Sequence, residues 1–403
     1  DEVLVAPGNA GTAREDKVRN VAVSSDDIDA LAKLAQAEEV ALTIVGPEAP
    51  LVAGVVDRFN ELNLPCFGPT AAAAQLEGSK AFTKDFLARH NIPTADYQSF
   101  TELAPALDYI RAQGAPIVIK ADGLAAGKGV IVAMTLEEAE QAATDMLAGG
   151  SFGAAGARIV VEEFLDGEEA SFIVITDGDV VLPLATSQDH KARDEGDVGP
   201  NTGGMGAYSP APVVTPEIEA RIMDEVIRPT LEGMKADGNP YLGFLYAGLM
   251  IMADGTPKVI EFNCRMGDPE TQPIMARLKS DLVDICLSTI EGDLAERDTL
   301  WDTRAALGVV MAAGGYPSSY EKGKVISGLE NADSNTQKVF HAGTALDGDN
   351  VLTSGGRVLC VVGLGHTVAD AAADAYEALA KIDWEDVYYR RDIGHRAIAR
   401  ENA

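Results

Sequence analysis

The stretch 118–133, VIKADGLAAGKGVIVA, constrains the fold of this chain more than any other segment. Its glycines and its two lysines lie between runs of β-branched residues, a composition typical of a loop that holds phosphate. A Walker A loop has four residues between its first glycine and its Gly-Lys pair, and a Ser or Thr and a helix follow. Here three residues separate Gly123 from Gly127, Gly129 follows Lys128, and the chain continues as a strand. The segment therefore predicts a glycine hairpin between two strands and excludes a P-loop.

Composition limits the remaining classes of protein. A chain of 403 residues with 46% hydrophobic and 24% charged residues predicts two to four soluble globular domains. The net charge of −31 argues against a nucleic-acid-binding surface, although a few lysines in a cleft can still attract phosphate. We find no apolar run of membrane-spanning length and no signal peptide, so we expect no membrane partner. Four scattered cysteines and five histidines without ligand spacing indicate reduced thiols, a cytoplasmic location and no zinc site.

Alternating strands and helices open the chain. VLVA, a helix over 26–37, ALTIVG, a helix over 49–62 and PCFG predict a βαβαβ unit with a parallel sheet. Ligands of such sheets bind at the carboxyl ends of the strands, where PGNAGT (7–12) and GPEAPL (46–51) lie. These loops are either tight turns or binding loops with backbone amides for phosphate, and the candidate residues are Gly8, Asn9, Gly11, Pro47 and Glu48.

Further elements predict two more domains. A helix over 80–90 precedes a compact α/β unit, in which helices over 102–113 and 136–147 flank the glycine hairpin. Beyond residue 303, short strands and one Ala-rich helix over 368–382 indicate an α+β domain. We expect an N-terminal parallel α/β domain at 1–77, a central domain at 78–298 with a small lid subdomain at about 95–166, and an α+β domain at 299–403.

The central region carries candidate residues for a nucleotide and a metal ion. Lys120 closes the strand before the hairpin, and IVVEEFL could present the backbone of Glu162, Glu163, Phe164 and Leu165 to a purine, with Glu169 free for a ribose. Later, Glu261 and Asn263 lie two apart on one strand face, followed by Arg265. A carboxylate and an amide oxygen suit Mg²⁺, and an arginine suits developing negative charge. Each piece alone is typical of a solvated surface, but the ordered set favours a nucleotide site.

At this point the chain resembles the ATP-grasp superfamily and, within it, the glycinamide ribonucleotide synthetase family. The resemblance covers essentially the whole chain and rests on PGNAGT, GPEAPLVAG, GPT with LEGSKAFTK, KADGLAAGKGV, SQDHKARDEGDVGPNTGGMGAYSP (187–210), EFNCRMGDPETQ (261–272) and RRDIGHRA (390–397). It implies a pre-ATP-grasp domain, a two-subdomain ATP-grasp domain and a C-terminal domain. It also implies that the hairpin is a mobile glycine lid over the phosphates of ATP.

The resemblance implies a carbon–nitrogen ligase of purine biosynthesis. ATP would phosphorylate glycine, and the amine of 5-phosphoribosylamine would attack the glycyl phosphate, giving ADP and phosphate. Lys80, Lys120, Lys128 and the hairpin glycines would bind ATP, Glu261 and Asn263 would bind Mg²⁺ or Mn²⁺, and Arg265 would stabilise the transferring group. The remaining substrate-binding residues would be Asp189, His190, Asn201, Thr202, Gly203, Gly204, Met205, Gly206, Gly267, Asp268 and Glu270. For His190 a purely structural hydrogen bond is the alternative. We expect a monomer.

Two departures from the family pattern bear on these expectations. The family begins with a strand, a glycine-rich turn and a helix, whereas this chain begins at Asp1 directly before what resembles the second strand. The strand 246–252 carries no acidic residue, so Glu261 and Asn263 would provide most of the metal binding. Three other functions stay open from the residues: a ligase for another carboxylate and amine, a nicotinamide-dependent dehydrogenase, and an inactive nucleotide-binding subunit. A dehydrogenase would need a G-x-G-x-x-G motif before a helix, and this sequence has none. An inactive subunit would be expected to have lost Lys120, Glu261 or Asn263, and all three are present.

Overall fold

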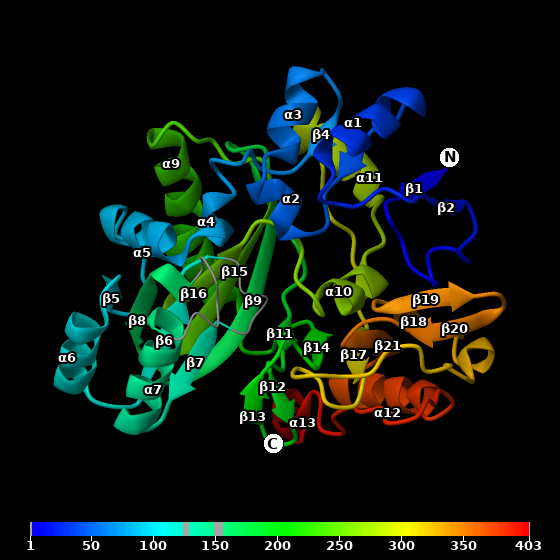
Figure 1. Cartoon of the computed structure of the whole chain (residues 1–403). Coiled ribbons are helices and arrows are strands. Elements are labelled where there is room, and N and C mark those ends of the chain that lie inside the picture. The colour runs from blue at the N-terminus through cyan, green and yellow to red at the C-terminus, as the bar shows by residue number, and fades with distance from the viewer. Residues whose placement is uncertain (1, 124–128, 149–155, 403) are drawn as a thin grey trace.

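A central antiparallel sheet lies among three other groups of elements in the computed structural model, which describes residues 2–123, 129–148 and 156–402 (Figure 1). The N-terminal elements, a small α/β unit and the C-terminal elements lie on three different sides of that sheet. The mixed α/β and α+β architecture agrees with the sequence-based expectation. The contacts among these parts bring the candidate site residues together.

Two separate pairs of short parallel strands form the N-terminal domain. Strand β1 (Val3–Val5) pairs with β2 (Val18–Asn20), and β3 (Thr43–Ile44) pairs with β4 (Cys66–Phe67). Helices α1 (Ile28–Ala37), α2 (Glu48–Val52) and α3 (Val55–Glu61) accompany them. The helix predicted over 49–62 is interrupted at Gly54, whose φ of 91° is a left-handed conformation that ends α2 and starts α3. The strands are parallel as expected, but they do not form one continuous sheet.

The small α/β unit lies in the range where we expect a lid subdomain. Its antiparallel sheet has the order β5 (Tyr97–Phe100), β8 (Ile159–Glu163), β6 (Ile117–Ala121) and β7 (Val130–Ala133). Helices α6 (Leu103–Gln113) and α7 (Leu136–Leu147) pack on it around a core that includes Ile110, Ile119 and Val161. Strands β6 and β7 pair antiparallel from Lys120 opposite Val130 outward, which confirms that the glycine-rich segment joins two paired strands.

The central sheet has four antiparallel strands. Their order is β10 (Val181–Pro183), β9 (Gly167–Thr176), β15 (Gly243–Met252) and β16 (Pro257–Asn263). Its helices are α4 (Gln75–Gly78), α5 (Lys80–Arg89), α8 (Pro216–Ile222), a π-helical turn (Met223–Ile227), α9 (Arg228–Ala236), α10 (Thr271–Arg277) and α11 (Leu282–Glu291). Strand β16 carries the Glu-x-Asn pair at its carboxyl end, so this edge of the sheet positions the proposed metal ligands.

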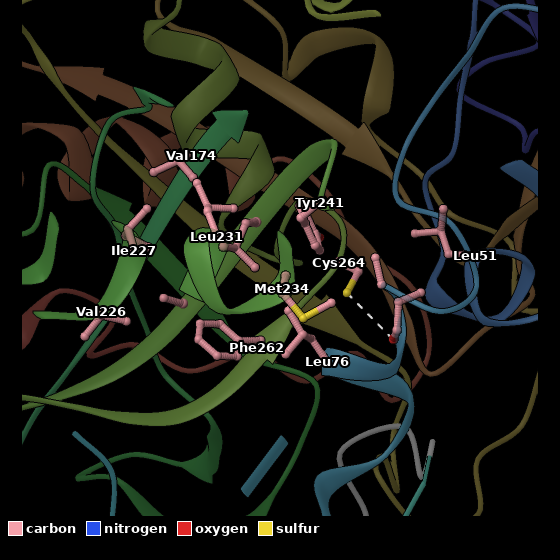
Figure 2. Packing of buried hydrophobic residues seen from close by; sticks show 14 of the residues in the cluster. Leu51, Leu76, Val174, Val226, Ile227, Leu231, Met234, Tyr241, Phe262 and Cys264 are labelled. Atoms are coloured by element: carbon pink, nitrogen blue, oxygen red, sulfur yellow. Dashed lines mark hydrogen bonds between the residues drawn. The ribbon is translucent and has the colours of Figure 1, made fainter. Parts of the chain in front are cut away.

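One hydrophobic core joins the N-terminal domain to the central sheet. Leu51 from α2 and Leu76 from α4 belong to the same buried cluster as Tyr241 and Phe262 (Figure 2). The Sγ atom of Cys264 lies 3.8 Å from the carbonyl oxygen of Ala74, which ties the end of β16 to the segment before α4. Each fully buried Leu or Phe side chain stabilises such a core by about 1.5–3 kcal/mol. The core therefore fixes the N-terminus of α2 against the end of β16.

The C-terminal sheet includes strands from an earlier part of the chain. Its order is β11 (Gln188–Asp189), β14 (Gly206–Ser209), β17 (Ala305–Ala312), β21 (Arg357–Gly365) and β18 (Gln337–His341), and α12 (Val368–Leu379) packs on it. The hairpins β12 (Ala192–Asp194) with β13 (Val198–Asn201) and β19 (Thr344–Asp347) with β20 (Asn350–Thr353), and the helix α13 (His395–Glu401), complete the domain. Because β11 and β14 flank residues 190–205, the C-terminal sheet anchors that family-specific segment.

Candidate active site

A lysine between carboxylates marks the centre of the site. Lys191 follows β11, and its Nζ lies 3.0 Å from Oε2 of Glu169 and 3.4 Å from Oε1 of Glu261. Burial acts to lower the pKa of Lys191, but Glu169, Glu261 and Asp189 outweigh burial, and the pKa is raised well above its usual value. The sequence analysis singled out its neighbours Asp189 and His190 and missed Lys191. Its position inside the most specific motif was the available signal.

Glu261 and Asn263 lie at the end of β16 as the sequence predicted. Glu261 is opposite Gly248 of β15 and Asn263 is opposite Tyr246. The positive charge of Lys191, together with the charges of Lys120 and Lys80, outweighs the effect of burial and lowers the pKa of Glu261 to about 2. The carboxylate is therefore ionised at any physiological pH. No group of three or more His, Cys, Asp and Glu side chains suited to a metal ion occurs within 2–123, 129–148 and 156–402. One anionic carboxylate and one amide oxygen fit Mg²⁺, which takes most of its other ligands from phosphates and water.

Lys120 is buried beneath this cluster and is already engaged. Its Nζ donates to Oε2 of Glu162 at 2.9 Å and to the carbonyl oxygen of Ile260 at 3.1 Å. The same Oε2 atom lies 3.0 Å from Nζ of Lys84, whose pKa burial lowers to about 8. The other oxygen of Glu162, Oε1, is buried and has no hydrogen-bond partner within the described part of the chain. The carboxylate of Glu162 thus anchors two lysines, a role that the sequence analysis did not assign to it.

The other predicted nucleotide residues surround Lys120. Lys80 begins α5 and donates to the carbonyl oxygen of Gly123 at 2.8 Å, which connects α5 to the glycine segment. Burial lowers the pKa of Lys80 more than Glu261 raises it. Gly129 is buried and its carbonyl accepts from Ala121. Gly127 and Lys128 lie outside the described residues.

The predicted purine edge comprises the last two residues of β8 and the two residues that follow it. The Glu163 carboxylate is exposed and lies 3.3 Å from Nζ of Lys258. Phe164 is half-buried and Leu165 is buried. Glu169 is the third residue of the next strand, β9, and its carboxylate contacts Lys191. This part of the site therefore adjoins the carboxylate cluster.

Arg265 connects the N-terminal domain to the cluster. Its guanidinium lies 3.3 Å from Oε2 of Glu48 at the start of α2 and 2.9 Å from Oε1 of Glu77 in α4. Burial, opposed by Arg265, raises the pKa of Glu77 to about 7. The sequence analysis predicted Glu48 and Arg265 separately, and the structure brings them into contact. It missed Glu77, whose partners Cys264 and Arg265 directly follow β16, far away in sequence.

Asp189 and His190 have different surroundings. Burial and the nearby carboxylates raise the pKa of Asp189, in spite of Lys191. The Nδ1 atom of His190 lies 3.3 Å from the carbonyl oxygen of Gly206, and its Nε2 accepts from the amide of Gly394 at 3.1 Å. Burial, followed by Arg390, lowers the pKa of His190 to about 4. Both ring nitrogens thus contact the backbone, which favours the structural alternative for this histidine.

The loop 201–206 and the turn 267–270 lie against each other. Thr202 contacts the carbonyl oxygen of Lys191 through both its amide and its hydroxyl group, at 2.8 and 2.9 Å. Oε1 of Glu270 accepts from Ser171 and Tyr246, both at 2.9 Å. Met205 is fully buried in the C-terminal core, so its side chain faces away from the site. The other predicted residues of these loops are Asn201, which pairs with Ala192, Gly206, which pairs with Val309, Gly203 and Gly204, which lie against Arg357 and Pro269, and Gly267 and Asp268 in the turn that contains Glu270.

The loop PGNAGT is folded around Asn9. Oδ1 of Asn9 accepts from the amides of Gly11 and Thr12 at 2.8 and 3.0 Å, and its Nδ2 donates to the carbonyl oxygen of His341 at 2.8 Å. Gly8 has a φ of 78°, and a side chain there would collide with Asn20. Two of the amides expected to hold phosphate are therefore satisfied internally, and the loop packs against the C-terminal domain.

The fold and the lysine–carboxylate cluster define an ATP-grasp ligase, a class that uses ATP and a divalent metal ion. Family models described as the N domain, the ATP-grasp (A) domain and the C domain of phosphoribosylglycinamide synthetase match residues 1–77, 78–271 and 306–396. The chain belongs to the phosphoribosylglycinamide synthetase family.

Relatives from several bacteria support this assignment. A protein of Escherichia coli O6:H1 named phosphoribosylamine–glycine ligase is 68% identical over 402 residues, which span 100% of this chain and 94% of that protein. A Vibrio cholerae protein of the same name is 66% identical over 403 residues, again 100% and 94% of the two chains. The matches to these relatives and to the family models rest on the amino-acid sequence and are therefore independent of the structure.

Solved structures agree with the fold. The phosphoribosylamine–glycine ligase of Thermotoga maritima superposes with a TM-score of 0.83 at 33% identity and covers 97% of this chain and 94% of its own. The biotin carboxylase domain of the Hydrogenobacter thermophilus 2-oxoglutarate carboxylase is 15% identical with a TM-score of 0.72, covers 96% and 86%, and shows the fold alone. Among the helices that the structure describes, none is long and apolar enough to span a membrane.

Proposed function

We propose that this chain joins glycine to 5-phosphoribosylamine and splits ATP to ADP and phosphate, giving glycinamide ribonucleotide for purine biosynthesis. The observation that carries the proposal is identity of 65–68% over the whole chain to proteins named for this reaction. The site supports it, because lysines, an arginine and an ionised carboxylate converge there, and the thiols of all four cysteines are buried. Such a site manages charge and holds substrates in place rather than forming a covalent bond to the protein.

We assign the nucleotide half of the site to the lid subdomain and β16. Lys80, Lys120 and Lys128 neutralise the phosphates of ATP, and Gly123, Gly127 and Gly129 let the backbone approach them. The backbone of Glu162 to Leu165 holds the purine, and Glu169 holds the ribose. Glu261 and Asn263 hold Mg²⁺, with Mn²⁺ as a substitute, and the bound cation would neutralise charge on the phosphates. Lys120 donates to Glu162 and to the carbonyl oxygen of Ile260, and an ammonium group has a third donor for phosphate, while Lys84 also pairs with the Glu162 carboxylate.

We assign the acceptor half to the segments that converge on Arg265. A carboxylate oxygen of glycine attacks the γ-phosphorus of ATP and ADP leaves, while Arg265 stabilises the negative charge on the transferred group. The amine of phosphoribosylamine then attacks the acyl carbon, phosphate departs with the oxygen from glycine, and the nitrogen loses a proton to water. Glu48 accepts hydroxyl groups of the ribose. Asp189, the loop 201–206 and the turn 267–270 enclose glycine and the amine.

The proposal extends to the setting of the reaction. We propose that the enzyme acts as a monomer, since one chain supplies every residue named above, and that its domains divide at 1–77, 78–298 and 299–403. The four free cysteines support a reducing compartment, for which we propose the cytoplasm.

The test is the dependence of phosphate release on each substrate. The full chain is incubated with ATP and Mg²⁺, with glycine and phosphoribosylamine added singly or together. We expect phosphate release at steady state only when both are present. Steady release with neither, or with another amino acid in place of glycine, would favour an ATP-grasp ligase for a different carboxylate and amine.

A further inference from the structure

Arg357, the first residue of β21, reaches from the C-terminal sheet to both loops of the acceptor half. Its Nη1 donates to the carbonyl oxygen of Gly203 at 2.6 Å and to that of Asp268 at 2.8 Å. Its Nη2 donates to Oδ2 of Asp268 at 2.8 Å. A single guanidinium therefore bridges the loop 201–206 and the turn 267–270. A planar group with five donors suits such a bridge, whereas an ammonium group could not match all three directions.

Tyr316, also from the C-terminal domain, holds the same loop from its other side. Its hydroxyl oxygen accepts from the amide of Gly203 at 3.0 Å, so Arg357 and Tyr316 bind both backbone polar groups of Gly203. A Cβ atom at Gly203 would lie 2.8 Å from Cζ of Arg357, and one at Gly204 would lie 2.3 Å from Cδ of Pro269. The glycines of the NTGGMG motif thus allow the guanidinium and the turn 267–270 to approach the loop closely.

Both bridged segments lead into the site. Thr202, directly before Gly203, holds the backbone of Lys191, whose ammonium group contacts Glu169 and Glu261. Asp268 lies between Arg265 and Glu270 in the turn, and Glu270 is buried with Ser171 and Tyr246. The bridge therefore sets the distance between the segment that carries Lys191 and the segment that carries Glu270, although Arg357 itself contacts only loop backbone and Asp268.

We propose that Arg357 and Tyr316 are positioning residues of the acceptor site: they fasten the loop 201–206 to the turn 267–270, so that the C-terminal domain shapes the space for glycine and phosphoribosylamine. The inference rests on the proposed function, because that function assigns these two segments to the acceptor substrates. The inference gives the C-terminal domain a role in binding the acceptor substrates, whereas ATP binding does not depend on that role.

Steady-state kinetics of Arg357→Gln, Arg357→Lys and Tyr316→Phe tests the proposal. Arg357→Gln should raise the KM for glycine, for phosphoribosylamine or for both about tenfold, since it removes several hydrogen bonds that act through the loops. Arg357→Lys should restore part of the loss, because a lysine keeps the charge but not the planar set of donors. Tyr316→Phe should raise the same KM values about two- to threefold. The dissociation constant for ATP, measured by calorimetry without the acceptors, should change less than about twofold.

Lys338→Gln is the matched control. Lys338 lies on β18, next to β21, and among the residues that the structure describes it pairs with the exposed carboxylates of Glu15 and Asp333. This variant should keep all KM values. Unchanged acceptor KM values in both Arg357→Gln and Tyr316→Phe, or equal losses for ATP and the acceptors, would overturn the inference.

The melting temperature of each variant shows whether it folds. If Arg357→Gln does not fold, the acceptor KM values of Tyr316→Phe test the inference in its place. If the wild-type protein released phosphate at steady state without both glycine and phosphoribosylamine, the proposed function itself would be refuted. The two failures are therefore distinguishable.

Discussion

At the scale of single residues, the site depends on how few cations balance many carboxylates. Lys191 lies between Glu169 and Glu261, and Lys120 and Lys84 share Glu162. Each of these lysines is therefore paired with at least one carboxylate before any nucleotide arrives, in a chain with a net charge of −31. Phosphate oxygens must compete with protein carboxylates for these ammonium groups, and a divalent cation at Glu261 must compete with Lys191.

Replacing the two proposed metal ligands should have unequal effects. Glu261→Ala should lower kcat by at least about a hundredfold, because it removes the only charged ligand and leaves Lys191 with one carboxylate fewer. Asn263→Ala should mainly raise the Mg²⁺ concentration needed for half-maximal rate, because an amide carries no charge. Titration of Mg²⁺ with each variant measures this. Near-normal rates of Glu261→Ala at low Mg²⁺ would contradict the metal assignment.

His190 should make the protein less stable in acid. The folded protein holds the pKa of His190 at about 4, whereas an unfolded histidine titrates near 6.5. Between these values the unfolded chain binds more protons, so stability is full above about pH 6.5 and falls as the pH drops toward 4. His190 should cost about 2 kcal/mol of unfolding free energy between pH 7 and pH 5.

Urea unfolding of the wild type and of His190→Gln at both pH values measures this contribution. The variant should lose less stability on acidification than the wild type. Equal losses in the two proteins would show that His190 is not the group responsible.

At the scale of elements, α7 depends on a local capping motif. The Thr135 hydroxyl accepts from the amide of Glu138, and the Glu138 carboxylate accepts from the amide of Thr135. Thr135→Ala should therefore destabilise the helix by about 1 kcal/mol and speed hydrogen exchange in α7. Thr144→Ala within the same helix, which removes no cap, is the control. Equal exchange rates in the two variants would contradict the role of the cap.

The start of α2 and the end of β6 should serve different substrates. Glu48→Ala should raise the KM for phosphoribosylamine severalfold and leave ATP affinity nearly unchanged, since Glu48 lies with Arg265 at the acceptor half. Lys120→Ala should weaken ATP binding, because the lid lysine lies on the nucleotide half. Binding and steady-state measurements on both variants test this division. Weakened ATP binding in Glu48→Ala with an unchanged amine KM would show that the two halves are interchanged.

Elements with a local signal could be predicted from the sequence. The strands around the glycine segment, α7 and β16 lie where periodicity and composition indicated, because apolar spacing and caps are contained in a few neighbouring residues. The interruption at Gly54 was not predicted, because the sequence pattern over 49–62 indicates one continuous helix. The pairing of β14 with β17 was not predictable, because the two strands lie about a hundred residues apart in the sequence.

At the scale of the whole molecule, the same reasoning explains which site residues were found. Glu261, Asn263 and Lys120 belong to an ordered motif and could be recognised. Lys191, Glu77 and Arg357 act through partners that are distant in the sequence, namely Glu261, Arg265 and Asp268. Their roles depend on how the segments around β11, α4 and β21 pack against these partners, and no local sequence pattern encodes that packing. The domains meet at the site, so each contributes residues that only the folded chain brings together.

The central claim is that the reaction passes through glycyl phosphate, and an isotope measurement tests it most directly. Glycine labelled with ¹⁸O in both carboxylate oxygens is supplied with ATP, Mg²⁺ and phosphoribosylamine, and the released phosphate is analysed by mass spectrometry. If a carboxylate oxygen attacks the γ-phosphorus, each phosphate should carry one ¹⁸O atom from glycine, in equal amount to the amide formed. Amide formation with unlabelled phosphate would contradict the account, because activation would then not proceed through transfer of the phosphoryl group to glycine.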